Sequence, residues 1–224
     1  MTKIIVSMTT WSKRIGTCIP TLKSILEQTV KPDAIEINLS YEQFPNGEKD
    51  IPEELKKLPV TIYWKEKDQK VYDKFLPTWK RHQGQDFIDI TVDDDCIYPK
   101  EYIEQVVKNM EGNDWLASQD DMATAGEWMV YRSTATDQLI PYLTDELIEE
   151  TPLDDHTILY LLRKVGAKRG HKIEAKIEDQ NLGYGYRRYW NPEMDEAECT
   201  KSACGYPHRE FVKERNVLQR YGII

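Results

Sequence analysis

Three consecutive carboxylates, Asp93, Asp94 and Asp95, carry the strongest chemical signal in the sequence. They follow residues 86–92, an apolar and β-branched run that is typical of a buried strand. In an extended segment Asp93 and Asp95 point to one side and Asp94 to the other, and carboxylates held so close need a compensating cation. Two convergent carboxylates suit Mg²⁺ or Mn²⁺, which would neutralise a diphosphate leaving group. The alternative is a solvated acidic turn after an edge strand.

A second acidic pair, Asp154 and Asp155, opens a helical pattern that continues through Ile158, Leu161 and Leu162. Carboxylates in the first turn of a helix stabilise its dipole and cap free N–H groups. For Asp154 this structural role explains the residue about as well as a catalytic role does. For Asp155 the structural explanation is weaker, so Asp155 is the better candidate for a catalytic group.

Cysteine and histidine spacing gives a weaker metal signal. The four cysteines are too irregular for a disulfide scaffold and favour a reducing compartment. Cys199, Cys204 and His208 resemble part of a zinc site, to which His171 or Asp195 would add a fourth ligand. The simpler interpretation is a loop with two free thiols ahead of a helix.

Aromatic residues and arginines are interleaved in residues 183–190. Tyr186, Arg187, Arg188 and Trp190 suit an anionic or stacked acceptor, and the alternative is an ordinary surface loop. Beyond residue 160, Lys and Arg outnumber Asp and Glu, although the whole chain has a formal charge of -9. This division suggests an anionic partner near the C-terminal third, and the simpler interpretation, which we prefer, is that Lys and Arg on late helices only solvate the surface.

The elements that must position these groups alternate along the first half of the chain. We expect strands at residues 3–8, 34–40, 60–64, 86–92, 114–118 and 127–132, with a further short one at 171–178. We expect helices at residues 19–26, 71–82, 99–110, 152–166 and 208–221. This alternation predicts an α/β fold with a mostly parallel central sheet flanked by helices, whose carboxyl edge binds ligands.

Composition excludes several classes of protein. The chain has 224 residues, of which 40% are hydrophobic and 31% charged, so it is long enough for one domain with a sizeable core and too apolar for a disordered polyelectrolyte. It holds no apolar run of about 20 residues and no segment typical of a secretory signal. We therefore expect a cytoplasmic enzyme.

Three segments resemble GT-A-fold nucleotide-sugar glycosyltransferases. They are residues 4–11 with Arg14, residues 22–33 (LKSILEQTVKPD), and residues 90–99 (ITVDDDCIYP). The nearest likeness is to small, family-two-like bacterial and viral members with a TVDDD motif. The resemblance implies a single GT-A-like (Rossmann-like) domain over residues 1–224, in which 1–118 bind the nucleotide sugar and 119–224 the acceptor.

The resemblance also implies roles for individual residues. The donor site would hold the nucleotide sugar through Thr9, Thr10, Arg14, Asp68, Lys74, Asp93 and Asp94. The ligands of Mn²⁺ or Mg²⁺ would be Asp95 and Asp93, joined by His208 or His171 from the C-terminal part. Asp155, or Asp154, would be the general base that an inverting transferase needs, and the lesser candidates are Glu127, Asp120 and Asp121. Whether the reaction is inverting or retaining is left open.

The activity implied is transfer of a hexosyl or pentosyl group from a nucleoside-diphosphate sugar, expected to be UDP-linked, to an acceptor hydroxyl. By resemblance the acceptor is a bacterial surface glycan or a lipid-linked precursor. One alternative is a viral enzyme of the host cytoplasm that glycosylates a hydroxymethylated or already glycosylated DNA base. Another is a non-catalytic protein that binds sugars or nucleotides. The oligomeric state is left open.

Overall fold

Six strands form one sheet in the order β3-β2-β1-β4-β6-β5. The computed structural model describes residues 2–16, 18–117, 129–151, 154–170 and 208–224, with the backbone alone for 208–212. The strands are β1 (Lys3–Met8), β2 (Ala34–Ser40), β3 (Thr61–Lys65), β4 (Phe87–Thr91), β5 (Trp115–Ala117) and β6 (Met129–Arg132). β1, β2, β3 and β4 pair in parallel, whereas β6 is antiparallel to β4 and β5. The expected α/β fold with a mostly parallel sheet is confirmed.

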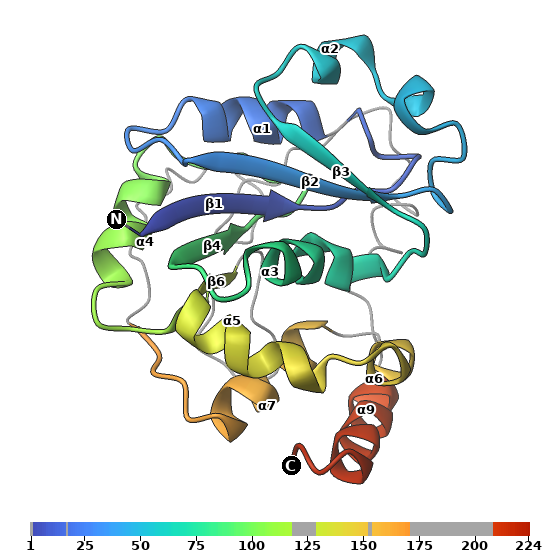
Figure 1. The fold of residues 1–224 in the computed structure, drawn as a ribbon, viewed down its shortest axis with the longest axis vertical. Coiled ribbons are helices and arrows are strands. Elements are labelled where there is room, and N and C mark those ends of the chain that lie inside the picture. The colour runs from blue at the N-terminus through green and yellow to red at the C-terminus, as the bar shows by residue number, and fades with distance from the viewer. Residues whose placement is uncertain (1, 17, 118–128, 152–153, 171–207) are drawn as a thin grey trace.

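Helices cover both faces of this sheet (Figure 1). The α-helices in the described residues are α1 (Cys18–Leu26), α2 (Glu53–Lys56), α3 (Leu76–His82), α4 (Tyr102–Asn109), α5 (Ser133–Leu139), α6 (Asp145–Glu150), α7 (Asp154–Lys164) and α9 (His208–Arg220). The 3-10 helices there are η1 (Gly47–Asp50), η2 (Lys70–Lys74) and η3 (Ile140–Tyr142). No helix among these residues is both long and apolar enough to cross a membrane.

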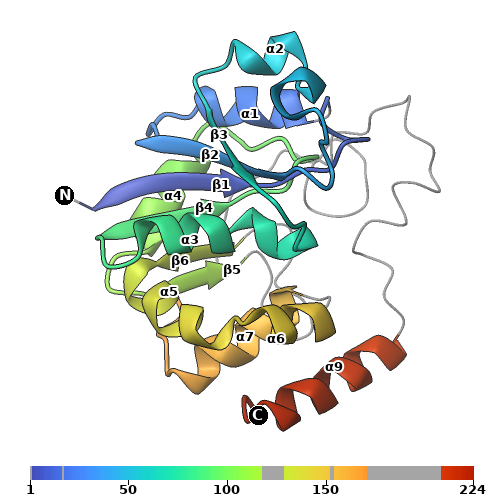
Figure 2. The ribbon, with the colours of Figure 1, turned by 45° about the vertical axis from the view of Figure 1, so that its right-hand side comes forward.

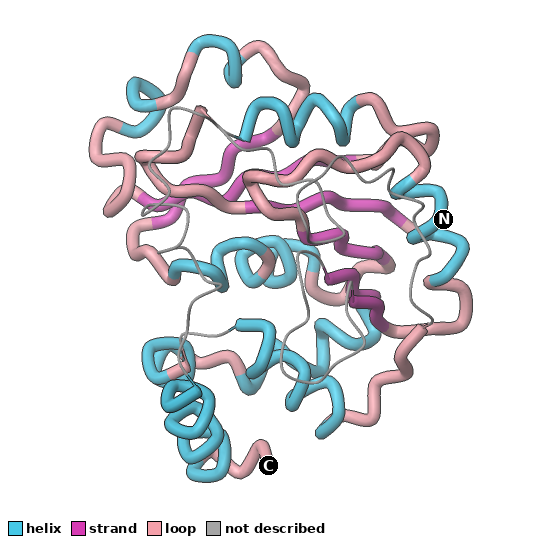
Figure 3. Tube along the Cα trace, turned by 180° about the vertical axis from the view of Figure 1, so that it is seen from behind, coloured by secondary structure: helices cyan, strands magenta, loops and turns pink. Residues whose placement is uncertain are grey.

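The core divides into two layers because side chains alternate along the buried strands. On β1, Val6 and Met8 belong to the cluster that α1 and α4 cover, while Ile5 belongs to the one that α3, α5 and α7 cover. β4 is buried on both faces along its whole length. Figure 2 shows the strands in succession between these layers, with α9 beyond α6 and α7, and Figure 3 shows the sheet from behind.

The helix expected over residues 71–82 is wrong as one continuous element. The segment splits into η2 and α3, and Pro77 lies in the first turn of α3. Proline lacks an N–H and its ring clashes with the carbonyl four residues earlier, so it is tolerated in a first turn but not in a helix interior. The break lets the residues of η2 face three different neighbours. The helices α5 and α6 were not expected from the sequence, and the strand expected at 171–178 lies outside the described residues.

Candidate active site at the carboxyl edge of the sheet

The chemical groups meet where β1 and β4 end. The two strands are parallel neighbours, and Ser7 lies opposite Thr91 in their register. Parallel strands end at the same edge of a sheet, so the loop from Thr9 to Arg14 and the carboxylates after β4 lie together. The Val92 N–H donates to the Ser7 carbonyl at 3.1 Å, so the pairing of β1 with the chain after β4 continues up to the residue before Asp93.

Asp94 ties these two loops together. The Thr10 hydroxyl donates to Asp94 Oδ2 at 2.5 Å, and Arg14 Nη2 pairs with Asp94 Oδ1. Thr10 and Arg14 are each 7% exposed and Asp94 9%, so the cluster is largely withdrawn from water. Burial raises the pKa of Asp94 to about 6 against the opposing charge of Arg14. The side chain of Asp94 therefore faces the framework, and its contact with a donor stays a prediction.

Asp93 and Asp95 converge, but the alternation expected of an extended chain is wrong here, because Asp94 and Asp95 lie in a turn and both contact Arg14 Nη2. One oxygen from each, together with Cys96 Sγ, lies within 4.8 Å of the others, and both aspartates are partly exposed. Arg14 Nη2 lies 2.8 Å from Asp95 Oδ2, and the Asp93 N–H donates to the Tyr98 hydroxyl at 3.0 Å. Two carboxylates with an exposed side fit the donor chemistry that Mg²⁺ and Mn²⁺ prefer. The Cys96 thiol was not among the metal ligands expected from the sequence, although Cys96 directly follows the three aspartates.

Lys74 reaches the same cluster from η2. Its Nζ donates to Asp93 Oδ1 at 2.6 Å. Burial works against the charge of Lys74, but the carboxylates of Asp93, Asp154 and Asp155 outweigh it and raise the pKa of the ammonium above its ordinary value. The structure therefore places Lys74 between the two acidic elements, which are about 60 residues apart in the sequence.

Asp154 and Asp155 differ in environment. Asp154 is 9% exposed at the start of α7, and its carboxylate accepts the backbone N–H of Asp155. Burial raises the pKa of Asp154, and Lys74 partly offsets this effect. Asp155 is more exposed. The buried acid thus binds an N–H group in the first turn of the helix, and the partly exposed Asp155 is the more accessible of the two.

The other predicted residues are more scattered. The Thr9 hydroxyl donates to the Asn38 carbonyl at 2.7 Å, and Asp68 accepts from Gln43 Nε2 at 2.7 Å and from the Lys70 N–H at 2.8 Å. These contacts place Asp68 in the loop after β3 and not in the carboxylate cluster itself. Outside the described residues or side chains lie Tyr186, Arg187, Arg188, Trp190, His171, Cys199, Cys204, His208, Asp195, Glu127, Asp120 and Asp121.

No protein-family model and no curated protein sequence matches the chain. Solved structures do match in fold. For residues 1–349 of TarS from S. aureus, in complex with UDP-GlcNAc, the TM-score is 0.59 at 13% identity, with 97% of this chain and 66% of that chain covered. For the mannosyltransferase PcManGT from Pyrobaculum calidifontis, in complex with GDP-Man and Mn²⁺, the TM-score is 0.52 at 14% identity, with 75% and 53% covered.

A third match is the 4-diphosphocytidyl-2C-methyl-D-erythritol synthase from Anaerococcus prevotii. Its TM-score is 0.51 at 13% identity, with 80% of this chain and 94% of that chain covered. The chain thus spans almost the whole synthase, but only 53% of the mannosyltransferase and 66% of the TarS fragment. At such low identity the common property is the fold: the chain has the GT-A-type α/β fold found in nucleotide-sugar glycosyltransferases and in this synthase.

Proposed function

We propose that this protein is a metal-dependent glycosyltransferase that moves a sugar from a nucleoside-diphosphate sugar to an acceptor hydroxyl. The observation that carries the proposal is the convergence of Asp93 and Asp95 at the carboxyl edge of the sheet, beside the cations Arg14 and Lys74. Open α/β sheets bind ligands at this edge. The matched structures with UDP-GlcNAc and with GDP-Man and Mn²⁺ support a nucleotide sugar as the donor, and we expect it to be UDP-linked.

Charge balance supports a divalent cation. The cluster brings together five carboxylates, Asp93, Asp94, Asp95, Asp154 and Asp155, and pairs them with two cations, Arg14 and Lys74. Like charges this close are unfavourable unless a further cation or bound protons compensate. Mn²⁺ or Mg²⁺ would be held by Asp95 and Asp93, with His208 as a further proposed ligand, and would neutralise the departing diphosphate. Lys74 would add its own positive charge at the same point.

Asp155 is the proposed general base. In a direct displacement the acceptor oxygen bonds to the anomeric carbon, the bond from that carbon to the diphosphate oxygen breaks, and the acceptor proton passes to the Asp155 carboxylate. Asp155 is more exposed than Asp154, and both lie close enough to Lys74 to raise its pKa. Asp154 then supports the helix that presents Asp155.

In this proposal the two halves of the chain bind different substrates. Residues 1–118 hold the donor, with Thr9, Thr10, Arg14 and Asp68 around the nucleotide, and residues 119–224 hold the acceptor. The proposed acceptor is a bacterial surface glycan or lipid-linked precursor, met by residues 186–190. A bound acceptor with aromatic and anionic groups would suit the tyrosine, arginine and tryptophan side chains of that segment.

A thermal-shift panel tests the donor site. Nucleoside diphosphates and nucleotide sugars are added with and without Mn²⁺ to wild type, to Asp95→Asn and to the control Asp50→Asn, whose exposed carboxylate contacts Asn46. We expect one nucleotide to raise the melting temperature in the presence of Mn²⁺, and the shift to vanish only in Asp95→Asn. Release of nucleoside diphosphate should follow the same pattern. A shift without turnover would identify a binding protein, and no shift with any nucleotide would refute the proposal.

A further inference from the structure

Three consecutive residues of η2 make contacts in three different directions. Tyr72 bonds to the end of α6, Asp73 pairs with Lys65 on β3, and Lys74 bonds to Asp93 after β4. A 3-10 turn allows this because successive side chains are about 120° apart around its axis. The position of the Lys74 ammonium therefore depends on what holds its two neighbours.

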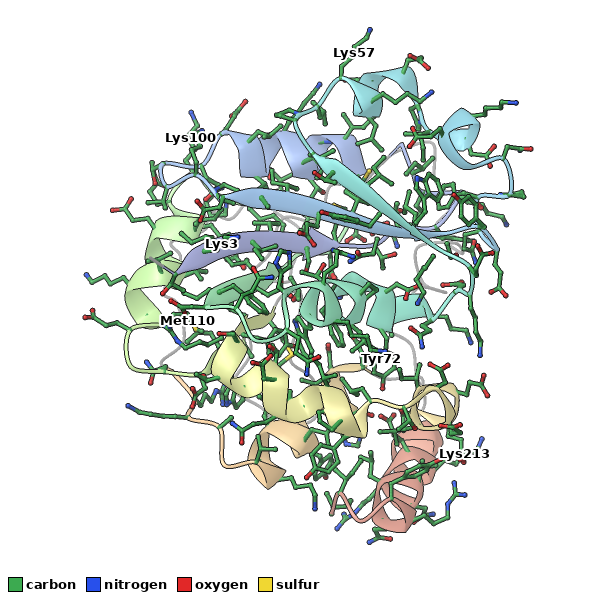
Figure 4. All side chains as sticks on the ribbon, viewed as in Figure 1. Lys3, Lys57, Tyr72, Lys100, Met110 and Lys213 are labelled. Atoms are coloured by element: carbon green, nitrogen blue, oxygen red, sulfur yellow. The ribbon has the colours of Figure 1, made fainter. Side chains whose placement is uncertain are left out.

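The hydroxyl of Tyr72 has a defined hydrogen-bond partner. The Thr151 hydroxyl donates its single proton to the Leu147 carbonyl at 2.7 Å, so Tyr72 must be the donor in the 2.8 Å bond to Thr151 Oγ1. Tyr72 is 1% exposed and Thr151 fully buried. Burial raises the pKa of Tyr72, which keeps the phenol neutral and able to donate. Figure 4 labels Tyr72 between the segment η2–α3 and the helices α5 and α6.

The same phenol touches the helix of the proposed base. Thr157 on α7 lies beside the Tyr72 hydroxyl, and the charge of Asp154 acts on that phenol. The Thr157 hydroxyl in turn donates to Glu214 Oε1 on α9 at 2.6 Å, and Glu214 is 1% exposed. Tyr72 thus connects η2 with α6, α7 and, through Thr157, α9.

The other side of the turn is also anchored. Asp73 is 1% exposed, pairs with Lys65 and accepts the Gln69 N–H at 3.0 Å. Lys70, at the start of η2, has a φ of 56°, a left-handed conformation that is unfavourable for residues other than glycine. A residue in such a conformation persists only where the surrounding contacts over-determine it. Tyr72 and Asp73 supply those contacts.

We infer that Tyr72 is a positioning residue: its bond to Thr151 holds Lys74 against Asp93 and sets its distance from Asp154 and Asp155. Among the described residues, the hydrogen-bond partner of Tyr72 is Thr151 and not a group that would meet the substrate, so Tyr72 acts through Lys74. The kinetic part of this inference rests on the proposed function, in which Lys74 stabilises the departing diphosphate. The structural part does not depend on any reaction.

Trace acetylation of lysines, read by mass spectrometry, tests the structural part. In wild type Lys74 should react slowly, because its ammonium is paired with Asp93 and its side chain is only 17% exposed. We expect Tyr72→Phe and Thr151→Val each to raise its labelling rate about fivefold or more, since a mobile amine spends more time unpaired. The reference is Lys164, which donates to the Gly222 carbonyl at 2.6 Å. Tyr131→Phe also removes one buried phenol oxygen, which donates to Met129 Sδ, and should leave Lys74 labelling unchanged.

Steady-state kinetics test the functional part. Tyr72→Phe should lower kcat by about ten- to a hundredfold with the donor KM nearly unchanged, because a displaced group loses its effect mainly in the transition state. Lys74→Met should lower kcat at least as much, and the double variant should be no worse than Lys74→Met, since Tyr72 acts through Lys74. Additive losses would refute the positioning role, as would unchanged Lys74 labelling in both Tyr72→Phe and Thr151→Val.

A wild type that transfers no sugar would refute the proposed function, while the labelling result would still decide the role of Tyr72.

Discussion

Asp89 gives the sharpest test of the physical reasoning, because its carboxyl group lies in the interior of the sheet layer. It is fully buried on β4, and its Oδ2 accepts the Trp79 indole N–H at 2.8 Å. Burial raises its pKa from an ordinary 3.8 to about 8. The folded protein therefore keeps Asp89 protonated at neutral pH, whereas the unfolded chain ionises it. Asp89→Asn keeps the shape and the acceptor for Trp79 but removes the titration.

The sign and size of the effect follow from this pKa shift. The folded state binds the proton more tightly, so the contribution of Asp89 to stability is largest below the unfolded pKa and is lost as pH rises toward about 8. One pKa unit corresponds to about 1.4 kcal/mol, so between pH 5 and pH 8 wild type should lose about 3 to 4 kcal/mol of unfolding free energy through this group.

Urea unfolding at pH 5, 6, 7 and 8 measures the difference between wild type and Asp89→Asn. Other titrating groups cancel in that difference. We expect the variant to gain on wild type by roughly 1 kcal/mol per pH unit or slightly more across this range. The control Asp137→Asn changes an exposed carboxylate that accepts the Gly84 N–H, and it should parallel wild type. A constant difference between Asp89→Asn and wild type at all four pH values would refute the assignment of a buried, protonated Asp89.

Three further predictions concern the charged groups. Arg14→Met leaves buried Asp94 without its cation and should lower the unfolding free energy by about 3 to 5 kcal/mol, and an unchanged urea midpoint would contradict this. Burial opposes ionisation of Glu36, but Arg81 and His82 lower its pKa below the ordinary 4.5. The ionised Glu36 therefore stabilises the folded state above pH 4.5, and this stabilisation is lost as the pH falls through the pKa of the folded state. Glu36→Gln should lack this acid-side loss, and an acid-unfolding curve that keeps it would count against the ion pairs. Chelation with EDTA should abolish any nucleotide-dependent rise in melting temperature and added Mn²⁺ should restore it, whereas a rise insensitive to EDTA would argue against the metal role of Asp95.

Local sequence pattern was enough to place most elements of the first half of the chain. The strands β1, β2 and β4 follow from short apolar runs, and the helix α1 follows from apolar residues at helical spacing. Each pattern is visible within the segment that forms the element. The position of Asp93, Asp94 and Asp95 directly after β4 follows from an apolar run that ends in three acids. What these have in common is that the information lies within a few residues of the element concerned.

Partner choice required the tertiary structure. Nothing near Lys74 in sequence indicates that its ammonium lies between Asp93 and α7, and nothing near Tyr72 indicates a bond to Thr151. Likewise, no local pattern tells that Arg14 neutralises Asp94 across 80 residues of chain. Such pairs form only when strands from distant parts of the sequence align and the loops after them meet. Local periodicity therefore determined where this chain forms strands, helices and a cluster of acidic residues. Only packing between residues far apart in the sequence decided which cation faces which acid. The pairing matters because burial removes the water that would otherwise compensate each charge.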